Sequence, residues 1–476
     1  MLLKTPLSKQ GGRLFRQVYE RLREAILTSA LGSGEQLPST RELAEQLGIS
    51  RTVVLLAYEQ LLAEGFVEGR RGSGTFVSAG IGSTRPISAR GRVRLPLTRF
   101  AAHAARGMSR ISSPVRQTML PYDFAYGRTD LDTFPFEHWR RMLLGSARRA
   151  SVAQLDYGPA GGSGRLRDAI CAHVRRARAV RCDPAQVIIV NGSQQALDLI
   201  ARVLIEPGSR AVIEDPSYQG MREVLRASGA RLCPVPVDRE GLDTSKLPAR
   251  SRIAFVTPSH QFPTGAILSL PRRLALLEWA RQHQAAIVED DFDGEFRYEG
   301  QPLESLQGLD AGQRVIYVGT FSRTLFPSLR VGYLIAPASL VTPLTYAKWL
   351  SDRQTATLEQ HALAELIESG AYERYLRRVR RRNAQRRRAL LQAIDTHLNG
   401  RVEVSGDASG AHVVIWPARR LSERDLVAAA ASRGVGVYGV AGYYLKTPPR
   451  AGILLGYNRM TEAQIREGVH RLSRCL

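Results

Sequence analysis

The 476-residue sequence has few cysteines and no long apolar segment. Its cysteines, Cys171, Cys182, Cys233 and Cys475, lack the Cys-x-x-Cys spacing of zinc or redox motifs. This usage is typical of reduced thiols and argues against a disulfide framework. No run of about 18 apolar residues occurs, so we expect no transmembrane helix. The first ten residues lack the apolar core and cleavage site of a secretory signal, so we expect a cytoplasmic protein.

Acidic residues are scarce relative to basic ones. The chain carries 67 Lys and Arg against 44 Asp and Glu, a formal net charge of +23. Such an excess favours polyanions, because cationic side chains at nucleic-acid phosphates release condensed counterions. A generic, solvated basic surface would give the same total, so the charge by itself leaves both interpretations open.

The first 80 residues have the pattern of a winged helix-turn-helix. Apolar residues recur at helical spacing over residues 14–28, and shorter helices are expected over 37–47 and 50–62. Gly48 separates the two shorter helices, and a tight turn between two short helices is the helix-turn-helix signature. Residues 65–77 then predict a β-hairpin with a basic, glycine-rich tip.

The distribution of polar side chains in this segment favours DNA as its ligand. In a helix-turn-helix the N-terminal residues of the second helix face the major groove, and a basic wing reaches the minor groove or the backbone. A winged-helix module that binds only proteins remains the alternative, although it needs no basic wing tip. The candidate DNA-binding residues are Arg41, Ser50, Arg51, Thr52, Arg70, Arg71 and Gly72.

Residues 11–78 resemble the GntR family of winged-helix regulators. The motifs that carry the match are LPSTRELA (37–44), SRTV (50–53) and GRRGSGTFV (69–77). This resemblance implies DNA contacts by Arg41, by Arg51 and by the wing. From residue 79 to 119 the sequence loses periodicity and is rich in Arg, Ala, Ser, Gly and Pro, which predicts a mostly irregular, basic linker. Either its arginines add non-specific affinity for DNA, or the linker is only a solvated tether.

After residue 120 short apolar segments alternate with amphipathic helices. Each expected strand is followed by a polar or glycine-rich turn, and alternation of this kind predicts an α/β fold with a mainly parallel sheet. Ligands bind beyond the carboxyl ends of such strands, where these polar turns lie. The expected strands are 187–190, 211–213, 253–256, 286–288 and 315–318.

Residues 120–476 resemble fold-type I aminotransferases, which depend on pyridoxal 5'-phosphate (PLP). The whole chain resembles the MocR/GabR family, in which such a domain follows a GntR-type winged helix. The resemblance implies a large part over about 120–365 and a smaller C-terminal α+β part over about 366–476. The motifs are DYGPAGG (156–162), NGSQQALD (191–198), EDPSY (214–218), TPSHQFPTG (257–265), EDDFDGEFRY (289–298) and YVGTFSRTLFPSLRVGY (317–333).

The resemblance also implies roles for individual residues. Tyr218 would stack on the pyridine ring, and Asp290 would face the ring nitrogen. Arg450 would bind the carboxylate of an amino-acid effector as a bidentate pair. Family members form head-to-tail dimers, in which Tyr157 would reach the neighbouring site. The residues expected around the cofactor phosphate are Gly192, Ser193, Gln194, Thr320, Ser322 and Arg330.

Two positions depart from the family pattern. Arg323 stands where the family has the Lys that forms the Schiff base, and a guanidinium stays protonated and offers no free amine. Phe292 stands where a Tyr would hydrogen-bond the cofactor ring. We therefore expect no catalytic residue and no transamination, with PLP bound non-covalently if it binds. The remaining lysines, none in a cofactor motif, are Lys4, Lys9, Lys246, Lys348 and Lys446.

The sequence therefore predicts a dimeric DNA-binding regulator with an aminotransferase-like domain. That domain is either a sensor of a B6 vitamer or amino acid, or a ligand-free scaffold for dimerisation. The alternative is an active PLP-dependent aminotransferase that carries a DNA-binding module, and Arg323 argues against it. The arginine-rich stretch over residues 377–388 is either a solvated helix face or an additional contact with DNA.

Overall fold

The computed structural model describes residues 14–81, 96–107, 120–127, 129–298 and 303–476. The chain divides into two compact units, residues 1–96 and 97–476, and each is described by itself. Most of the predicted linker, residues 82–95 and 108–119, lies outside the described residues. Within the described ranges no helix is both long enough and apolar enough to cross a membrane.

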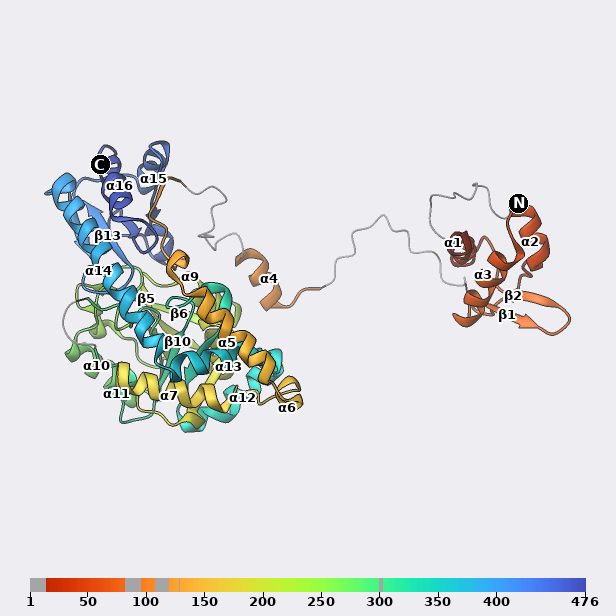
Figure 1. Cartoon of the computed structure of the whole chain (residues 1–476), viewed down its shortest axis with the longest axis horizontal. Helices are drawn as coiled ribbons and strands as arrows, with labels where there is room; N and C mark the ends of the chain where they lie inside the picture. Colours follow the sequence, from red (N-terminus) through yellow and green to blue (C-terminus); the bar gives the residue numbers. More distant parts are fainter. Residues whose placement is uncertain (1–13, 82–95, 108–119, 128, 299–302) are drawn as a thin grey trace. The chain divides into compact units, whose positions relative to one another are not determined.

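The first unit is a winged helix (Figure 1), as the sequence predicted. Its apolar core packs Val18 and Leu22 of the first helix against Val54 and Leu61 of the third. The two strands pair antiparallel and form the wing. The elements are α1 (Leu14–Leu27), α2 (Thr40–Leu47), α3 (Arg51–Ala63), β1 (Val67–Arg70) and β2 (Gly74–Val77).

Local interactions fix both ends of α2. Ser39 and Glu42 form a capping box, in which each side chain accepts a hydrogen bond from the other's backbone amide. Gly48 ends the helix with φ of 65°, a left-handed conformation that glycine adopts without strain. The Tyr58 hydroxyl of α3 donates to the Pro38 carbonyl at 2.7 Å, which ties α3 to the start of α2.

The second unit is built on an eight-stranded sheet with the order β4-β11-β10-β9-β8-β5-β6-β7. Neighbours from β10 to β6 run parallel, whereas β11 is antiparallel to both β10 and β4. The sheet is therefore mixed, with the mainly parallel centre that the sequence predicted. Its strands are β4 (Val187–Val190), β5 (Arg210–Asp215), β6 (Arg231–Asp238), β7 (Gly241–Leu242), β8 (Ile253–Val256), β9 (Ala286–Asp290), β10 (Val315–Thr320) and β11 (Gly332–Ile335).

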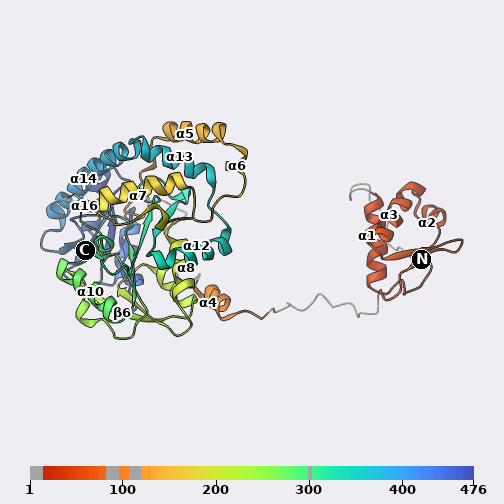
Figure 2. The same ribbon diagram turned by 90° about the horizontal axis from the view of Figure 1, so that it is seen from below.

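Helices cover both faces of this sheet because its strands are apolar on both sides. Val187 and Ile189 of β4 face one helical layer, and Ile188 and Val190 face the other. Figure 2 shows the first layer gathered on one side of the sheet. That layer contains α5 (Phe136–Arg149), α7 (Gly164–Arg178), α13 (Thr357–Glu368) and the first half of α14 (Ala371–Leu398), and the opposite layer contains α8 (Ser193–Leu204), α9 (Gln219–Ala227) and α12 (Ala338–Asp352).

Three further short or peripheral helices belong to the large part of this unit. The longest is α10 (Leu270–Gln282), whose Leu276 and Trp279 pack against the sheet beside β8 and β9. The other two are α6 (Val152–Leu155) and α11 (Leu306–Leu309).

The small part is an antiparallel sheet covered by helices, and α14 spans both parts. β3 (Tyr122–Asp123) pairs with β14 (Val435–Gly436), so the first strand of the unit pairs with the small part. The family resemblance had implied that the large part begins at about residue 120. The remaining elements are β12 (Val402–Ser405), β13 (His412–Pro417), β15 (Tyr438–Gly439), β16 (Ile453–Gly456), α15 (Glu423–Ser432) and α16 (Glu462–Ser473).

A helix lies within the segment for which the sequence predicted mostly irregular structure. α4 (Arg99–Gly107) packs against α9, and His103 lies 3.4 Å from Glu223 of that helix. The segment is too short for its periodicity to stand out against the surrounding Arg, Ala and Ser. Its contacts come from α9, more than 100 residues along the chain, which local sequence does not reveal.

Candidate functional sites

The N-terminus of α3 presents polar residues to solvent. Ser50 occupies the N-cap position, as predicted, but its hydroxyl makes no capping hydrogen bond. Arg51 and Thr52 are exposed in the first turn, and Arg41 is exposed on α2. The Arg51 Nε donates to the Thr40 hydroxyl at 3.2 Å, which holds its guanidinium beside the start of α2. Unpaired backbone amides and the helix dipole at such an end attract phosphate.

The wing carries two exposed arginines, of which one is paired with a neighbouring side chain and the other lies at the tip. Arg70 pairs with Glu68 at 2.8 Å, and its guanidinium lies 4.6 Å from the centre of the Phe76 ring. Arg71 and Gly72 form the exposed tip, where Gly72 has φ of 75°. The exposed Arg70 pair contributes little to stability, so exchanging Glu68 for a phosphate costs little.

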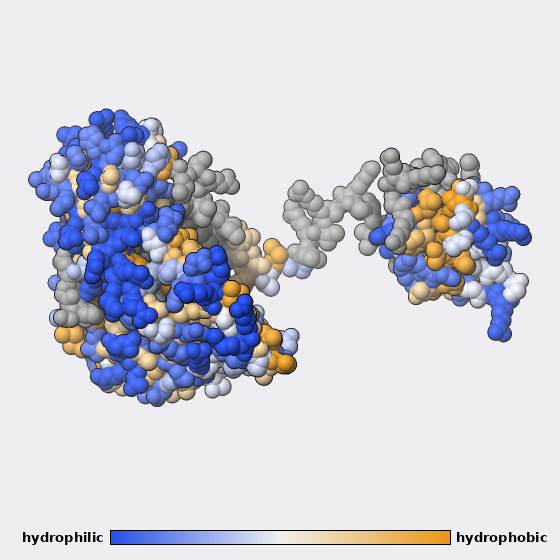
Figure 3. All heavy atoms as spheres, viewed as in Figure 1, coloured by the Kyte–Doolittle hydropathy of each residue, from blue (hydrophilic) through white to orange (hydrophobic). Residues whose placement is uncertain are grey.

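Three large apolar side chains on α3 also face solvent, which the sequence pattern did not indicate. Leu55, Leu56 and Leu62 are 43%, 45% and 41% exposed. Figure 3 shows a hydrophobic patch on this unit. Because α3 is apolar on most of its surface, its pattern does not mark which leucines lie outside the core. Exposed apolar groups on a helix in the major groove are suited to contact thymine methyl groups.

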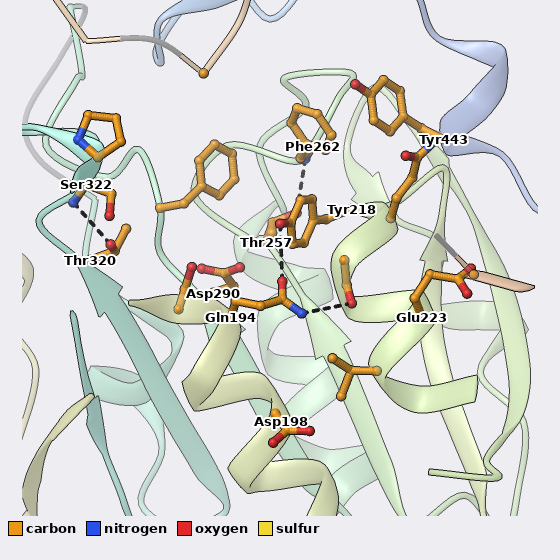
Figure 4. Close-up of a pocket in the computed structure, with 18 of the residues that line it drawn as sticks. Gln194, Asp198, Tyr218, Glu223, Thr257, Phe262, Asp290, Thr320, Ser322 and Tyr443 are labelled. Atoms are coloured by element: carbon orange, nitrogen blue, oxygen red, sulfur yellow. Dashed lines mark hydrogen bonds between the residues drawn. The ribbon is translucent and has the colours of Figure 1, made fainter. Parts of the chain in front are cut away.

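The second unit contains a cavity of about 730 Å³ at the carboxyl ends of its strands. Strand register brings the predicted motifs together there, since Gly332 pairs with both Val190 and Thr320. Figure 4 shows the side chains from these separate turns converging on one space. The predicted cofactor residues that line the cavity are Ser193, Gln194, Tyr218, Asp290, Phe292, Thr320, Ser322, Arg323 and Arg330.

One end of the cavity has the features of an anion site. Gly192 precedes the first turn of α8 with φ of 85°, and a Cβ there would lie 2.6 Å from Arg330 Nη2. Arg330 donates to the Asn191 carbonyl at 2.7 Å, beside the same helix end. The Ser322 amide donates to the Thr320 hydroxyl at 3.1 Å, and the buried Ser322 hydroxyl has no hydrogen-bond partner among the described residues. A helix N-terminus, a cation and an unused hydroxyl together suit a phosphate.

The middle of the cavity suits a flat, protonated ring. The Tyr218 hydroxyl donates to the Gln194 side-chain oxygen at 3.3 Å, which holds the ring at the cavity wall (Figure 4). Burial, with a contribution from Asp291, raises the pKa of Asp290 to about 7, while Arg323 lowers it. The inner oxygen of Asp290 has no hydrogen-bond partner within the described part of the chain. A cationic ring nitrogen would supply one.

Arg323 lies inside the cavity among aromatic rings. Its guanidinium is 4.3 Å from the centre of the Tyr126 ring and 5.9 Å from that of Phe292. Burial alone would lower the pKa of Arg323. Tyr126 and the carboxyl groups of Asp293 and Asp290 raise it by more than burial lowers it, so the pKa lies above its usual value. The side chain is therefore a permanent cation with no nucleophilic amine.

Arg450 does not line the cavity in this structure. Its guanidinium pairs with Glu403 at 2.6 Å and lies 4.7 Å from the centre of the Trp416 ring. Leu454, four residues later, lines the cavity instead. A motif gives the position of an arginine in the chain but not the acidic partner that holds its side chain.

Tyr157 is 71% exposed, and the Arg353 guanidinium lies 4.1 Å from the centre of its ring. Its side chain is thus held at the surface by a cation–π contact rather than packed in the core. An exposed position is what the predicted contact with a second subunit requires.

The cavity also has walls that the sequence motifs did not indicate. Phe100 and His103 of α4 contribute to it, as do Tyr126, Phe262 and Tyr443. None of these residues stands in a position that the motifs mark as a cofactor contact. They become neighbours only through the packing of α4 on α9 and of the small part on the large part.

The arginine-rich stretch of α14 is not uniformly solvated. Arg386 pairs with Asp130 at 2.9 Å, and Arg380 donates to the Glu295 carbonyl at 2.6 Å. Arg377, Arg378 and Arg381 are exposed. Part of the stretch therefore holds α14 to the rest of the unit, and only the exposed residues are placed for either of the predicted roles.

Known protein families match both units. Residues 14–77 match the GntR family of bacterial regulatory proteins, and residues 123–472 match the aminotransferase class I and II family. Among solved structures, LysN from Thermus thermophilus has a TM-score of 0.70 and 32% identity over 78% of this chain and 96% of its own. LysN is an α-aminoadipate aminotransferase, crystallised with N-(5'-phosphopyridoxyl)-L-leucine.

The chain is therefore a GntR-type winged helix joined to a fold-type I aminotransferase domain. Two bacterial regulators match both units. The probable rhizopine catabolism regulatory protein MocR of Rhizobium meliloti is 37% identical over 96% of this chain and 93% of its own. The pyridoxine biosynthesis transcriptional regulator PdxR of Corynebacterium glutamicum is 32% identical over 94% of this chain and 93% of its own. The protein belongs to the MocR-type GntR regulators, which confirms the family that the sequence motifs resemble.

Proposed function

We propose that this chain is a transcription regulator whose residues 11–78 bind operator DNA and whose residues 120–476 bind a B6 vitamer reversibly. The aminotransferase-like domain forms no covalent bond to that ligand and does not transaminate. The observation that carries the proposal is Arg323, a guanidinium inside the cavity at the position of the family's Schiff-base Lys. Among the described lysines none lines the cavity.

The residues present fit the non-covalent part of PLP. The N-terminus of α8 and Arg330 would hold the phosphate, together with the unused hydroxyl of Ser322. Asp290 would pair with the ring nitrogen, and Tyr218 would lie against the ring. PLP would supply electron withdrawal to an amino acid whose amine is bonded to its aldehyde carbon. In the family enzymes a Lys amine holds that carbon at rest and then moves the proton, and the Arg323 guanidinium can do neither. The remaining contacts, which need no Lys, serve recognition.

DNA binding is proposed for the exposed N-terminal turn of α3 and for the wing. Ser50, Arg51 and Thr52 would enter the major groove, and Arg41 would contact a phosphate from α2. Arg71 at the wing tip would reach the minor groove or the backbone. The chain would bind as a head-to-tail homodimer, as the family resemblance implies, with the exposed Tyr157 at the partner's site.

Calorimetric titration of the full chain with PLP and with pyridoxamine phosphate tests the ligand. We expect saturable binding of at least one of them, full release on dialysis, and no adduct on a cavity residue after borohydride treatment of the PLP complex. A borohydride-stable adduct that peptide mapping places on a cavity residue would instead identify a working PLP enzyme. Absence of both heat and a stability shift with either ligand would leave the domain as a scaffold for dimerisation.

A further inference from the structure

Three buried side chains with metal-ligating atoms converge behind the cavity. His260 follows β8, Asp293 follows β9, and His412 begins β13 of the small part. Their ligand atoms all lie within 4.8 Å of one another, and the side chains are 2%, 2% and 0% exposed. Three segments separated by long stretches of chain thus place two imidazoles and a carboxylate around one point.

The atoms at this point lack well-formed hydrogen bonds. Within the described part of the chain, neither Asp293 oxygen forms a hydrogen bond of ordinary geometry, although the Ala411 backbone amide interacts with that carboxyl group. His260 Nε2 and His412 Nδ1 also have no hydrogen-bond partner there. Burying polar atoms without partners costs free energy, so native structures rarely leave several together. A bound cation would satisfy all of them at once.

The other nitrogen of each imidazole is held by an oxygen. His412 Nε2 lies 2.8 Å from the Pro263 carbonyl, so it carries the ring proton and leaves a lone pair on Nδ1. His260 Nδ1 lies 3.0 Å from the Ser409 hydroxyl, which orients Nε2 toward the cluster. Histidines that bind metals have this arrangement, in which an outer oxygen fixes the tautomer and the ring plane.

Charged groups also lie around the cluster. The Arg323 guanidinium interacts with the carboxyl groups of Asp293 and Asp290 and opposes a second cation. Those two carboxyl groups act in the opposite sense and favour a cation.

We propose that His260, Asp293 and His412 bind a zinc-class divalent metal ion. Two imidazoles and one carboxylate are a common zinc ligand set, which leaves one position of a tetrahedral ion for a water molecule. Bonds of about 2.0–2.1 Å require each donor atom to move inward by less than about 1 Å from the observed positions. The site stands on these residues alone and does not depend on B6 binding.

The metal would fix one wall of the cavity. The His412 ring makes an edge contact with the Tyr126 ring at 4.5 Å between centres, and Tyr126 in turn lies against Arg323. The ion would hold the large and small parts together, because its ligands come from both. Its role is therefore to position the aromatic wall rather than to perform chemistry.

The test measures the metal content of untagged full-length protein after expression with added zinc. We expect one zinc ion per chain, lost to a chelator with a fall in Tm and restored by Zn²⁺. His412→Gln and Asp293→Asn should lower zinc affinity at least about ten-fold. His173→Gln is the matched control, since His173 is equally buried but pairs with Glu373 at 2.9 Å outside the cluster.

X-ray absorption at the zinc edge of the wild-type protein gives a reading that does not depend on whether the variants fold. We expect nitrogen and oxygen ligands with the signature of imidazole and without sulfur. Sulfur ligands, a wild-type protein that takes up no zinc, or correctly folded variants that keep the full zinc content would each overturn the assignment.

Discussion

Replacing Arg323 by Met tests the electrostatics of the cavity most sharply. Met has nearly the length of Arg and no charge, so the substitution removes the cation while it keeps much of the volume. Arg323 lies against the Tyr126 ring at 4.3 Å and lowers the pKa of Asp290. The variant therefore loses a cation–π contact and leaves a half-buried carboxylate without its nearest positive charge.

The size of the effect depends on pH. Leaving a buried charge uncompensated costs about 3–5 kcal/mol, and we expect the lower end, about 3 kcal/mol at pH 8, because the cavity admits water to Arg323. In the folded protein the pKa of Asp290 is about 7, above its ordinary value of 3.8. Ionisation of this carboxyl group therefore destabilises the fold above pH 7, and this destabilisation disappears as the pH falls toward 3.8. At pH 5 the carboxyl is protonated, and only the cation–π loss of about 1–2 kcal/mol remains.

Urea unfolding followed by tryptophan fluorescence measures these values. All four tryptophans, Trp139, Trp279, Trp349 and Trp416, lie in the aminotransferase-like unit, so the signal reports that unit alone. Arg330→Met is the matched control, because Arg330 is a cavity-lining cation that is exposed and hydrogen-bonded to a backbone carbonyl. The free energy of unfolding of Arg330→Met should be about 1 kcal/mol lower than that of the wild type at both pH values. An Arg323→Met deficit that is the same at pH 5 and pH 8 would refute the reasoning.

Further variants test other parts of the account. Arg323→Lys should gain a borohydride-reducible adduct with PLP at residue 323, and an unmodified residue 323 after reduction would show that the cavity does not admit the ring. Gly192→Ala should weaken B6 phosphate binding at least about ten-fold, since its φ of 85° and the nearby Arg330 exclude a Cβ; unchanged affinity would place the phosphate elsewhere. Arg51→Ala should weaken operator binding about ten-fold, whereas Arg16→Ala on α1, an exposed arginine paired with Glu20, should not; equal losses would remove α3 from the interface.

Sequence patterns predicted the elements whose signal is local. The strand over 286–290 is an apolar run that ends in acidic residues. The first helix of the helix-turn-helix, α2, is delimited by Ser39 and Gly48, whose caps depend on neighbours in sequence. The position of the cavity followed as well, because the carboxyl ends of parallel strands meet at one edge of a sheet. Arg323 was found because a motif fixes its place within the loop after β10.

Features that depend on distant partners were not predictable in this way. The side chain of Arg450 is held by Glu403 and Trp416, and nothing near residue 450 in the sequence indicates either contact. α4 is stabilised on α9, and β3 joins the small part through β14. The cluster of His260, Asp293 and His412 arises only when two sheets pack together, so their separate motifs give no metal-ligand spacing.

The proposed function as a regulator is tested most directly by measuring DNA binding of the full chain with and without its ligand. Mobility-shift titration would use the DNA upstream of the protein's own gene, a scrambled duplex as the control, and PLP or pyridoxamine phosphate at saturation. We predict a sequence-specific shift whose affinity changes with the ligand and returns to its starting value after dialysis. Binding that does not distinguish the two duplexes, or a ligand effect that persists because PLP has become covalently attached, would contradict this prediction.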